Sequence, residues 1–169
     1  MTTTSRAITL SILMILALFA APVRAQQALK PEETAKIKAD VLEALQKYND
    51  AFNRRDSKFI GEKVFTNPSV AMGPNGVVLK SAEEIDKQYA GSTQRLVEIG
   101  WEKSVPARYN ICILNPNTAL YNGLFNRVRK DGSVIQGTAT TYMFIKVKDG
   151  WRMSALFGTS LDKTVTCSD

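Results

Sequence analysis

The chain has 169 residues, a formal net charge of +6 and no histidine. Without an imidazole, Ser-His-Asp triads, histidine general bases and histidine-ligated metals are excluded. The lysines and arginines are scattered along the chain, whereas nucleic-acid binding needs a concentrated basic patch. The sequence also has neither a phosphate-cradling G-x-x-x-x-G-K motif nor a dinucleotide-binding G-x-G-x-x-G motif. We therefore expect no nucleic-acid partner, no metal and no cofactor.

Residues 1–25 have the pattern of a removable export signal. Arg6 precedes an uncharged apolar stretch from Ala7 to Ala21, and Val23-Arg24-Ala25 resembles a cleavage site for signal peptidase. This stretch is shorter than the about 20 apolar residues that a membrane-spanning helix needs. We predict a single domain over residues 26–169 that is periplasmic or secreted, with no stable membrane insertion after cleavage. An uncleaved anchor is the alternative.

The two cysteines, Cys112 and Cys167, leave two interpretations open. Outside the cytoplasm they can form one intramolecular disulfide. Alternatively, Cys112 is buried as a thiol and Cys167 lies on a frayed tail.

The first half of the chain predicts helices. Pro31-Glu32-Glu33 is typical of a helix start, and apolar residues then recur every three or four positions up to Arg54 and Arg55. Asp56 is placed to cap a short second helix. Ser81-Ala82-Glu83-Glu84 is a capping box, which predicts a third helix that ends near Gly100. Between the second and third helices, Val70 to Leu79 is typical of a hairpin.

After Gly100 the apolar period changes to two. Residues 108–115, 118–129, 133–148 and 151–161 are predicted strands, separated by turn sequences that include Asp131-Gly132 and Asp149-Gly150. Helices followed by successive strands indicate an α+β fold, in which a curved antiparallel sheet packs on about three N-terminal helices.

Counting outward from the two Asp-Gly turns gives the register of the sheet. If each turn is a two-residue loop, Tyr142 faces Tyr121 on one side and Phe157 on the other. Continuing through the Asn115–Thr118 turn adds Asn110 and Arg108 to the same face. One face then collects Ala119, Tyr121, Gly123, Phe125, Arg127, Thr138, Thr140, Tyr142, Phe144 and Phe157. The other face collects Leu120, Leu124, Val128, Ile135, Ala139, Met143, Ile145 and Leu156.

Both faces are too apolar to lie open to water. The aliphatic face predicts a homodimer through the sheet, unless the curl of the strands hides it. The aromatic face mixes hydroxyls with rings, as ligand pockets do. Arg108 and Arg127 at one end of it are suited to a carboxylate or phosphate, unless both side chains extend into solvent.

Several segments carry a family resemblance. They are Ala51-Phe52-Asn53-Arg54-Arg55-Asp56, Asn67-Pro68, Gly73-Pro74-Asn75-Gly76 and Asp149-Gly150-Trp151-Arg152-Met153. In this order, over about residues 32–162, the chain resembles the nuclear-transport-factor-2-like (NTF2-like) superfamily, in particular its SnoaL-like and DUF4440-like bacterial members. The resemblance implies a cone-shaped fold, a pocket inside the concave face and dimers through the convex face.

Catalysis in that superfamily usually rests on Asp or His projecting into the cone. Here residues 103–130, 133–148 and 151–161 contain no carboxylate. We therefore predict no catalytic residue and favour a non-catalytic domain that binds a small, partly apolar molecule, with an anionic group for the arginines. The predicted ligand-binding residues are Tyr48, Asn67, Arg108, Asn110, Tyr121, Phe125, Arg127 and Tyr142. One alternative is an isomerase- or dehydratase-type enzyme using Tyr or Arg, with Tyr48 or Tyr142 as proton donor. The other is a dimeric interaction module without a ligand.

Overall fold

The helices begin where the sequence predicts. In the computed structural model, which describes residues 28–73 and 76–167, α2 spans Pro31–Asn53 and buries one apolar stripe. The short α3 (Ser57–Phe59) is capped by Asp56, whose Oδ1 accepts a hydrogen bond from the Phe59 amide at 3.1 Å. It continues into η1 (Ile60–Val64), a π-helical turn. The predicted export signal at residues 1–25 lies outside the described residues.

The third predicted helix is α4 (Ala82–Glu98), and its capping box is confirmed. Ser81 Oγ accepts a hydrogen bond from the Glu84 amide at 3.2 Å, and the Ser81 amide donates to Glu84 Oε2 at 2.8 Å. These two bonds satisfy amides that the first turn of a helix leaves without partners. Within the described residues, no helix is both long and apolar enough to cross a membrane.

The sheet has six strands in the order β2-β1-β6-β5-β4-β3. Their bounds are β1 Phe65–Gly73, β2 Gly76–Lys80, β3 Lys103–Asn115, β4 Thr118–Val128, β5 Val134–Val147 and β6 Gly150–Thr159. Neighbouring strands are antiparallel except β1 and β6, which are parallel. The fold is therefore α+β as predicted, but the sheet is mixed. No turn joins β1 to β6, so the local sequence carries no signal for that pairing.

The predicted register is right on one side of β5 and wrong on the other. Tyr121 pairs with Tyr142. At the second turn the two-residue loop is Lys148-Asp149 rather than Asp149-Gly150, and a bulge follows between Met143 and Phe144. Leu156, not Phe157, therefore lies opposite Tyr142. Because side chains alternate along a strand, the two residues exchange the faces that we had expected.

Bulges also shift β3 by one residue. They fall between Ile113 and Asn115 and between Pro106 and Arg108. As a result Ile111 pairs with Tyr121, whereas Asn110 pairs with Asn122. The expectation that Arg108 and Asn110 share a face with Tyr121 is wrong.

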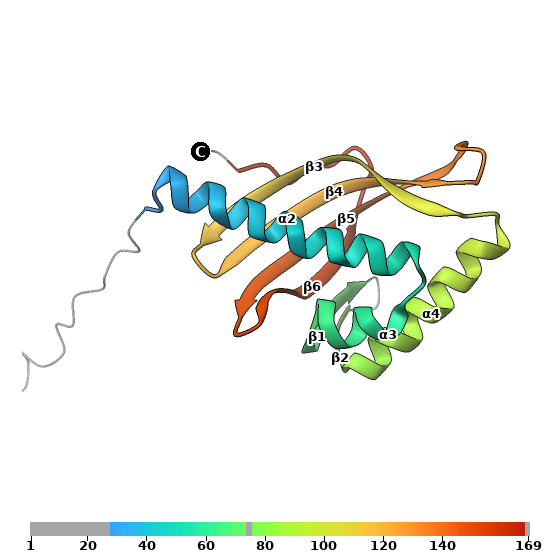
Figure 1. Cartoon of the computed structure of the whole chain (residues 1–169), viewed down its shortest axis with the longest axis horizontal. Helices are drawn as coiled ribbons and strands as arrows, with labels where there is room; N and C mark the ends of the chain where they lie inside the picture. The colour runs from blue at the N-terminus through green and yellow to red at the C-terminus, as the bar shows by residue number, and fades with distance from the viewer. Residues whose placement is uncertain (1–27, 74–75, 168–169) are drawn as a thin grey trace, which may run out of the picture.

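Helix α2 lies across one face of the sheet (Figure 1). The aromatic side chains of the sheet pack with those of the helices in one hydrophobic core on this face. Tyr48 of α2 lies 5.6 Å from the ring of Tyr142 on β5 and 6.0 Å from the ring of Tyr89 on α4, measured between centroids. Phe52, one turn further along α2, contacts Trp101 at 5.3 Å. We call this helix-covered side the concave face and the opposite side the convex face.

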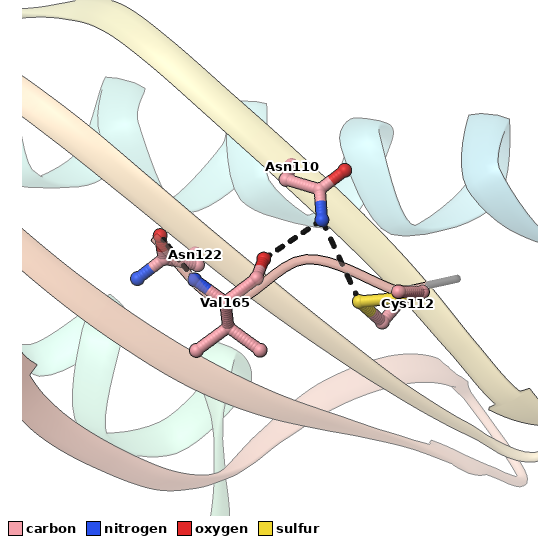
Figure 2. Close-up of a disulfide and its surroundings, with 5 residues drawn as sticks. Asn110, Cys112, Asn122 and Val165 are labelled. Atoms are coloured by element: carbon pink, nitrogen blue, oxygen red, sulfur yellow. Dashed lines mark hydrogen bonds between the residues drawn. A yellow bond between two sulfur atoms is a disulfide. The ribbon is translucent and has the colours of Figure 1, made fainter. Parts of the chain in front are cut away.

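A short C-terminal segment crosses the convex face. Residues 160–167, which we call the strap, end in a disulfide between Cys167 and Cys112 of β3. Figure 2 shows the strap in front of the strands with α2 behind them. The structure thus pairs the two cysteines.

Gly123 provides the space for the best-buried tyrosine of the sheet. Tyr121 is 0% exposed, and its ring lies over Gly123. A Cβ on Gly123 would lie 2.4 Å from Tyr121 Cε1, which no real contact tolerates. The ring cannot yield easily, because Tyr109 stacks on it with a centroid separation of 5.6 Å.

We expect Gly123→Ala to lower the free energy of unfolding by about 1–3 kcal/mol, the usual cost of overpacking a core. Gly158→Ala is the matched control, because a Cβ at Gly158, also a strand glycine, meets nothing within 4 Å. Urea unfolding followed by circular dichroism measures both. Equal effects of the two substitutions would contradict the packing account of Gly123.

Candidate functional site

A pocket of about 550 Å³ lies on the concave face between α2, α4 and strands β4 to β6. Its apolar part comes from Phe52, Leu96, Ile99, Ala139 and Leu156. Its polar part comes from Tyr48, Gln88, Tyr89, Ser92, Arg95, Arg127, Gln136, Thr138, Thr140 and Tyr142, with Gly158 completing the wall. Apolar walls with a few convergent polar groups are typical of small-molecule sites.

Three tyrosine hydroxyls meet in the pocket. Tyr142 donates a hydrogen bond to Tyr48 Oη at 3.4 Å, and the hydroxyls of Tyr48 and Tyr89 are also 3.4 Å apart. All three side chains are buried. The bonds are long, so the hydroxyls retain capacity for a ligand that brings a stronger acceptor.

Burial keeps these hydroxyls protonated. Loss of solvent is the largest cause that raises the pKa of Tyr48, and the neighbouring Tyr89 raises it further. The pKa values of Tyr89 and Tyr142 are raised for the same first reason. At neutral pH the three residues are therefore hydrogen-bond donors rather than bases.

Arg127 on β4 is the charged group of the pocket interior. Its guanidinium carbon lies 4.7 Å from the centroid of the Phe52 ring, and its Nη1 donates to Ser104 Oγ. Ser104 is itself held by Asn53, whose Oδ1 accepts from the Ser104 amide at 2.8 Å. These two hydrogen bonds hold the guanidinium group of Arg127 in position. Arg127 Nε is buried and has no partner among the described residues.

The residues that line this site carry a net positive charge. Among the described residues, those lining the pocket include Arg127 and Arg95 but no Asp or Glu. Arg95 lies on α4 at the exposed rim, where its Nη2 donates to Ser92 Oγ at 3.3 Å. A buried donor without a partner, in a pocket with two cations, favours an anion.

Three of the predicted site residues, Tyr48, Arg127 and Tyr142, line the pocket together. Two more lie beside it in the core. The ring of Tyr121 is 5.9 Å from that of Tyr142, and the ring of Phe125 is 6.2 Å from that of Tyr121. Both are too deeply packed to line the pocket, so they support its wall from behind.

The other three predicted residues lie elsewhere. Asn67 is exposed on β1, beside a shallow hollow that also includes Ser81. Arg108 and Asn110 project from the convex face and bond the strap, donating to the carbonyl oxygens of Leu161 and Val165 respectively. The structure therefore does not bring these three residues to Arg127.

Sequence reasoning missed the contribution of α4. Gln88, Ser92 and Arg95 form a polar stripe at steps of four and three beside buried Tyr89. The spacing alone identifies one face of a helix. A polar stripe next to an apolar one is a usable signal for a helix that borders a pocket.

A second hollow, of about 650 Å³, lies between α2, η1 and the β5–β6 turn. Its charged groups have both signs, and several pair with one another or with neighbours. Glu43 pairs with Lys47 at 2.7 Å, and Asp40 with Lys36 at 2.9 Å. Among the described residues, no group of three or more cysteine, aspartate or glutamate side chains is placed to hold a metal. We therefore take the pocket around Arg127 as the candidate site.

The comparison with protein families agrees with the observed fold. Residues 38–160 match the family described as "NTF2-like protein (DUF6841)". The chain belongs to this NTF2-like family. No curated protein matches the chain.

Solved structures show the same fold at low identity. An NTF2-like superfamily protein from Salmonella enterica has a TM-score of 0.55 at 20% identity, covering 77% of this chain and 94% of that one. An NTF2-like protein with a cystatin-like fold from Novosphingobium aromaticivorans has a TM-score of 0.60 at 14% identity, with coverages of 76% and 84%. A putative calcium/calmodulin-dependent protein kinase II association domain from Xanthomonas campestris has a TM-score of 0.54 at 15% identity, with coverages of 82% and 96%. These likenesses establish the fold alone.

The buried tyrosines predict loss of stability at alkaline pH. Their pKa values lie above the ordinary 10.0 in the folded chain, so the fold retains protons that the unfolded chain releases. The contribution of these tyrosines to the free energy of unfolding is complete below pH 10.0. It is lost as the pH rises toward their raised pKa values. We expect Tyr48→Phe to make this alkaline decline shallower, as measured by urea unfolding between about pH 8 and about pH 11. A decline of unchanged steepness would contradict the assignment.

Proposed function

We propose that this NTF2-like domain is a non-catalytic receptor for a small, partly apolar monocarboxylate, bound in the concave pocket with its carboxylate on Arg127. The unpartnered, buried Nε of Arg127 carries the proposal, because buried polar groups normally have partners. A planar guanidinium is suited to a carboxylate, and a small shift of the side chain on binding would offer it Nε and Nη2 together. Tyr48 and Tyr142 would donate to the same ligand.

The buried tyrosines favour binding over catalysis. A general base needs a pKa near the working pH, whereas those of Tyr48 and Tyr142 lie well above it. No carboxylate lines this pocket in the described part of the chain to take their place.

The proposal also includes the compartment, the subfamily and the oligomeric state of the receptor. The pattern of residues 1–25 supports export to the periplasm or beyond. The motifs at residues 51–56 and 149–153 support a relation to the SnoaL-like and DUF4440-like members of the superfamily. The convex face supports a homodimer, because the register aligns half-buried Leu120 and Met143 there, and Phe157 joins them. Sedimentation of the mature chain as a monomer would contradict the dimer.

The binding proposal is tested with paired ligands. Ligand-detected NMR with a panel of aromatic and aliphatic monocarboxylates should find binders whose primary amides, of the same shape, bind much more weakly. Arg127→Ala should weaken binding of the acids by about 10–100-fold, as expected for a lost charge-assisted bond. Arg129→Ala is the matched control, because exposed Arg129 carries the same charge outside the pocket.

Equal binding of acids and amides would overturn the anionic ligand class. If no acid of the panel binds, native mass spectrometry of protein purified from its own host decides the outcome. A retained mass that Arg127→Ala abolishes sustains the pocket, whereas bare protein favours an interaction module without a ligand.

A further inference from the structure

The strap is held to the convex face by few contacts besides its covalent bond. The Val165 amide donates to Asn122 Oδ1 at 3.3 Å, and Asn110 Nδ2 donates to the Val165 carbonyl at 2.8 Å (Figure 2). Arg108 bonds the carbonyl of Leu161, whose side chain packs close to Gly137. Residues 160–167 form no part of the hydrophobic core. Their main anchor is therefore the bond between Cys167 and Cys112.

Opening that bond disturbs little else. Every residue from 160 to 167 is exposed, whereas Cys112 is only 3% exposed. The sheet beneath keeps its own pairings, since the strap contributes no strand to it.

We propose that the strap is a redox-sensitive latch: a dithiol opens the Cys112–Cys167 disulfide, residues 160–167 leave the convex face, and the rest of the fold stays in place. In the oxidised chain the strap covers part of the convex face. The reduced chain presents the sheet surface beneath it, including the side-chain amides of Asn110 and Asn122 and the side chain of Leu124.

The difference in exposure between the two cysteines determines which sulfur atom the dithiol attacks. A thiolate of the dithiol attacks the sulfur of exposed Cys167, the disulfide breaks, and the electron pair leaves on Cys112 Sγ, which takes up a proton. The second thiol of the reagent then attacks the mixed disulfide and releases Cys167 as a thiol. The two electrons come from the dithiol, which leaves as a disulfide. Attack at Cys112 is disfavoured because that residue is buried.

Lys163 provides a direct probe of the latch, because it lies exposed in the middle of the strap. The mature chain is incubated with or without dithiothreitol, exposed briefly to trypsin, quenched, fully reduced and then weighed by mass spectrometry. Free thiols are counted in parallel. We expect reduction to yield two thiols per chain and to raise the rate of cleavage after Lys163 about tenfold or more, since proteolysis follows the open population.

The matched control is the double variant C112S/C167S. It should be cleaved after Lys163 at the rate of the reduced wild type and should not respond to dithiothreitol. Hydrogen exchange of the β4 and β5 amides should be the same in oxidised and reduced protein, which separates release of the strap from opening of the domain.

Three results would overturn the latch. One is a cleavage rate after Lys163 that reduction leaves unchanged, because noncovalent contacts would then hold the strap. Another is a disulfide that resists dithiothreitol in the folded protein. The third is faster exchange throughout β4 and β5 on reduction, because the bond would then stabilise the whole domain rather than the strap.

Discussion

The contact between α2 and the aromatic face of the sheet is the interaction on which the rest of the molecule depends. Tyr48 is its centre, with ring centroids of Phe52, Tyr89 and Tyr142 between 5.6 and 6.0 Å away. A phenol buried this way contributes apolar area through its ring but brings a hydroxyl that needs a partner. The structure meets this need by gathering three hydroxyls at one point. The polar part of the pocket is therefore a direct consequence of how the core closes.

The fold could be predicted from the sequence because its signals are local. Capping at Ser81 and Asp56 marks helix starts, and the register from Tyr121 to Arg127 agrees with the count from the turn near Asp131. The failures are also physical. A bulge inserts one residue without changing the apolar pattern enough to reveal it, and one residue is sufficient to reverse every face beyond it. The parallel pairing of β1 with β6 depends on packing between distant segments, which no turn sequence encodes.

The same reasoning separates the predicted site residues that meet from those that do not. Arg127 and Tyr142 lie where the sequence predicts because two departures cancel: the loop near Asp131 is longer than two residues, and the irregularity between Arg127 and Val128 restores the expected register. Arg108 and Asn110 lie beyond the irregularity between Ile113 and Asn115, so both project from the opposite face to the one predicted. Asn67 follows η1 closely in the sequence, and such a position gives no direction for its side chain. The stripe on α4 was missed because the rotation of a helix about its axis is settled only by packing.

Strand β4 contributes side chains to the pocket and to the surface beneath the strap. The two sets lie on opposite faces because side chains alternate along a strand. Arg127 and Tyr121 project to the concave side, whereas Asn122 and Leu124 project to the convex side. A substitution at Cys167 therefore removes no residue that lines the pocket, and Arg127→Ala removes no hydrogen bond of the strap. Ligand binding in the pocket and release of the strap can therefore be lost separately. Whether a ligand on Arg127 alters the cleavage rate at Lys163 then measures coupling between the two sites through the sheet, where Ala139 of β5 borders both the pocket and the hollow beneath the strap.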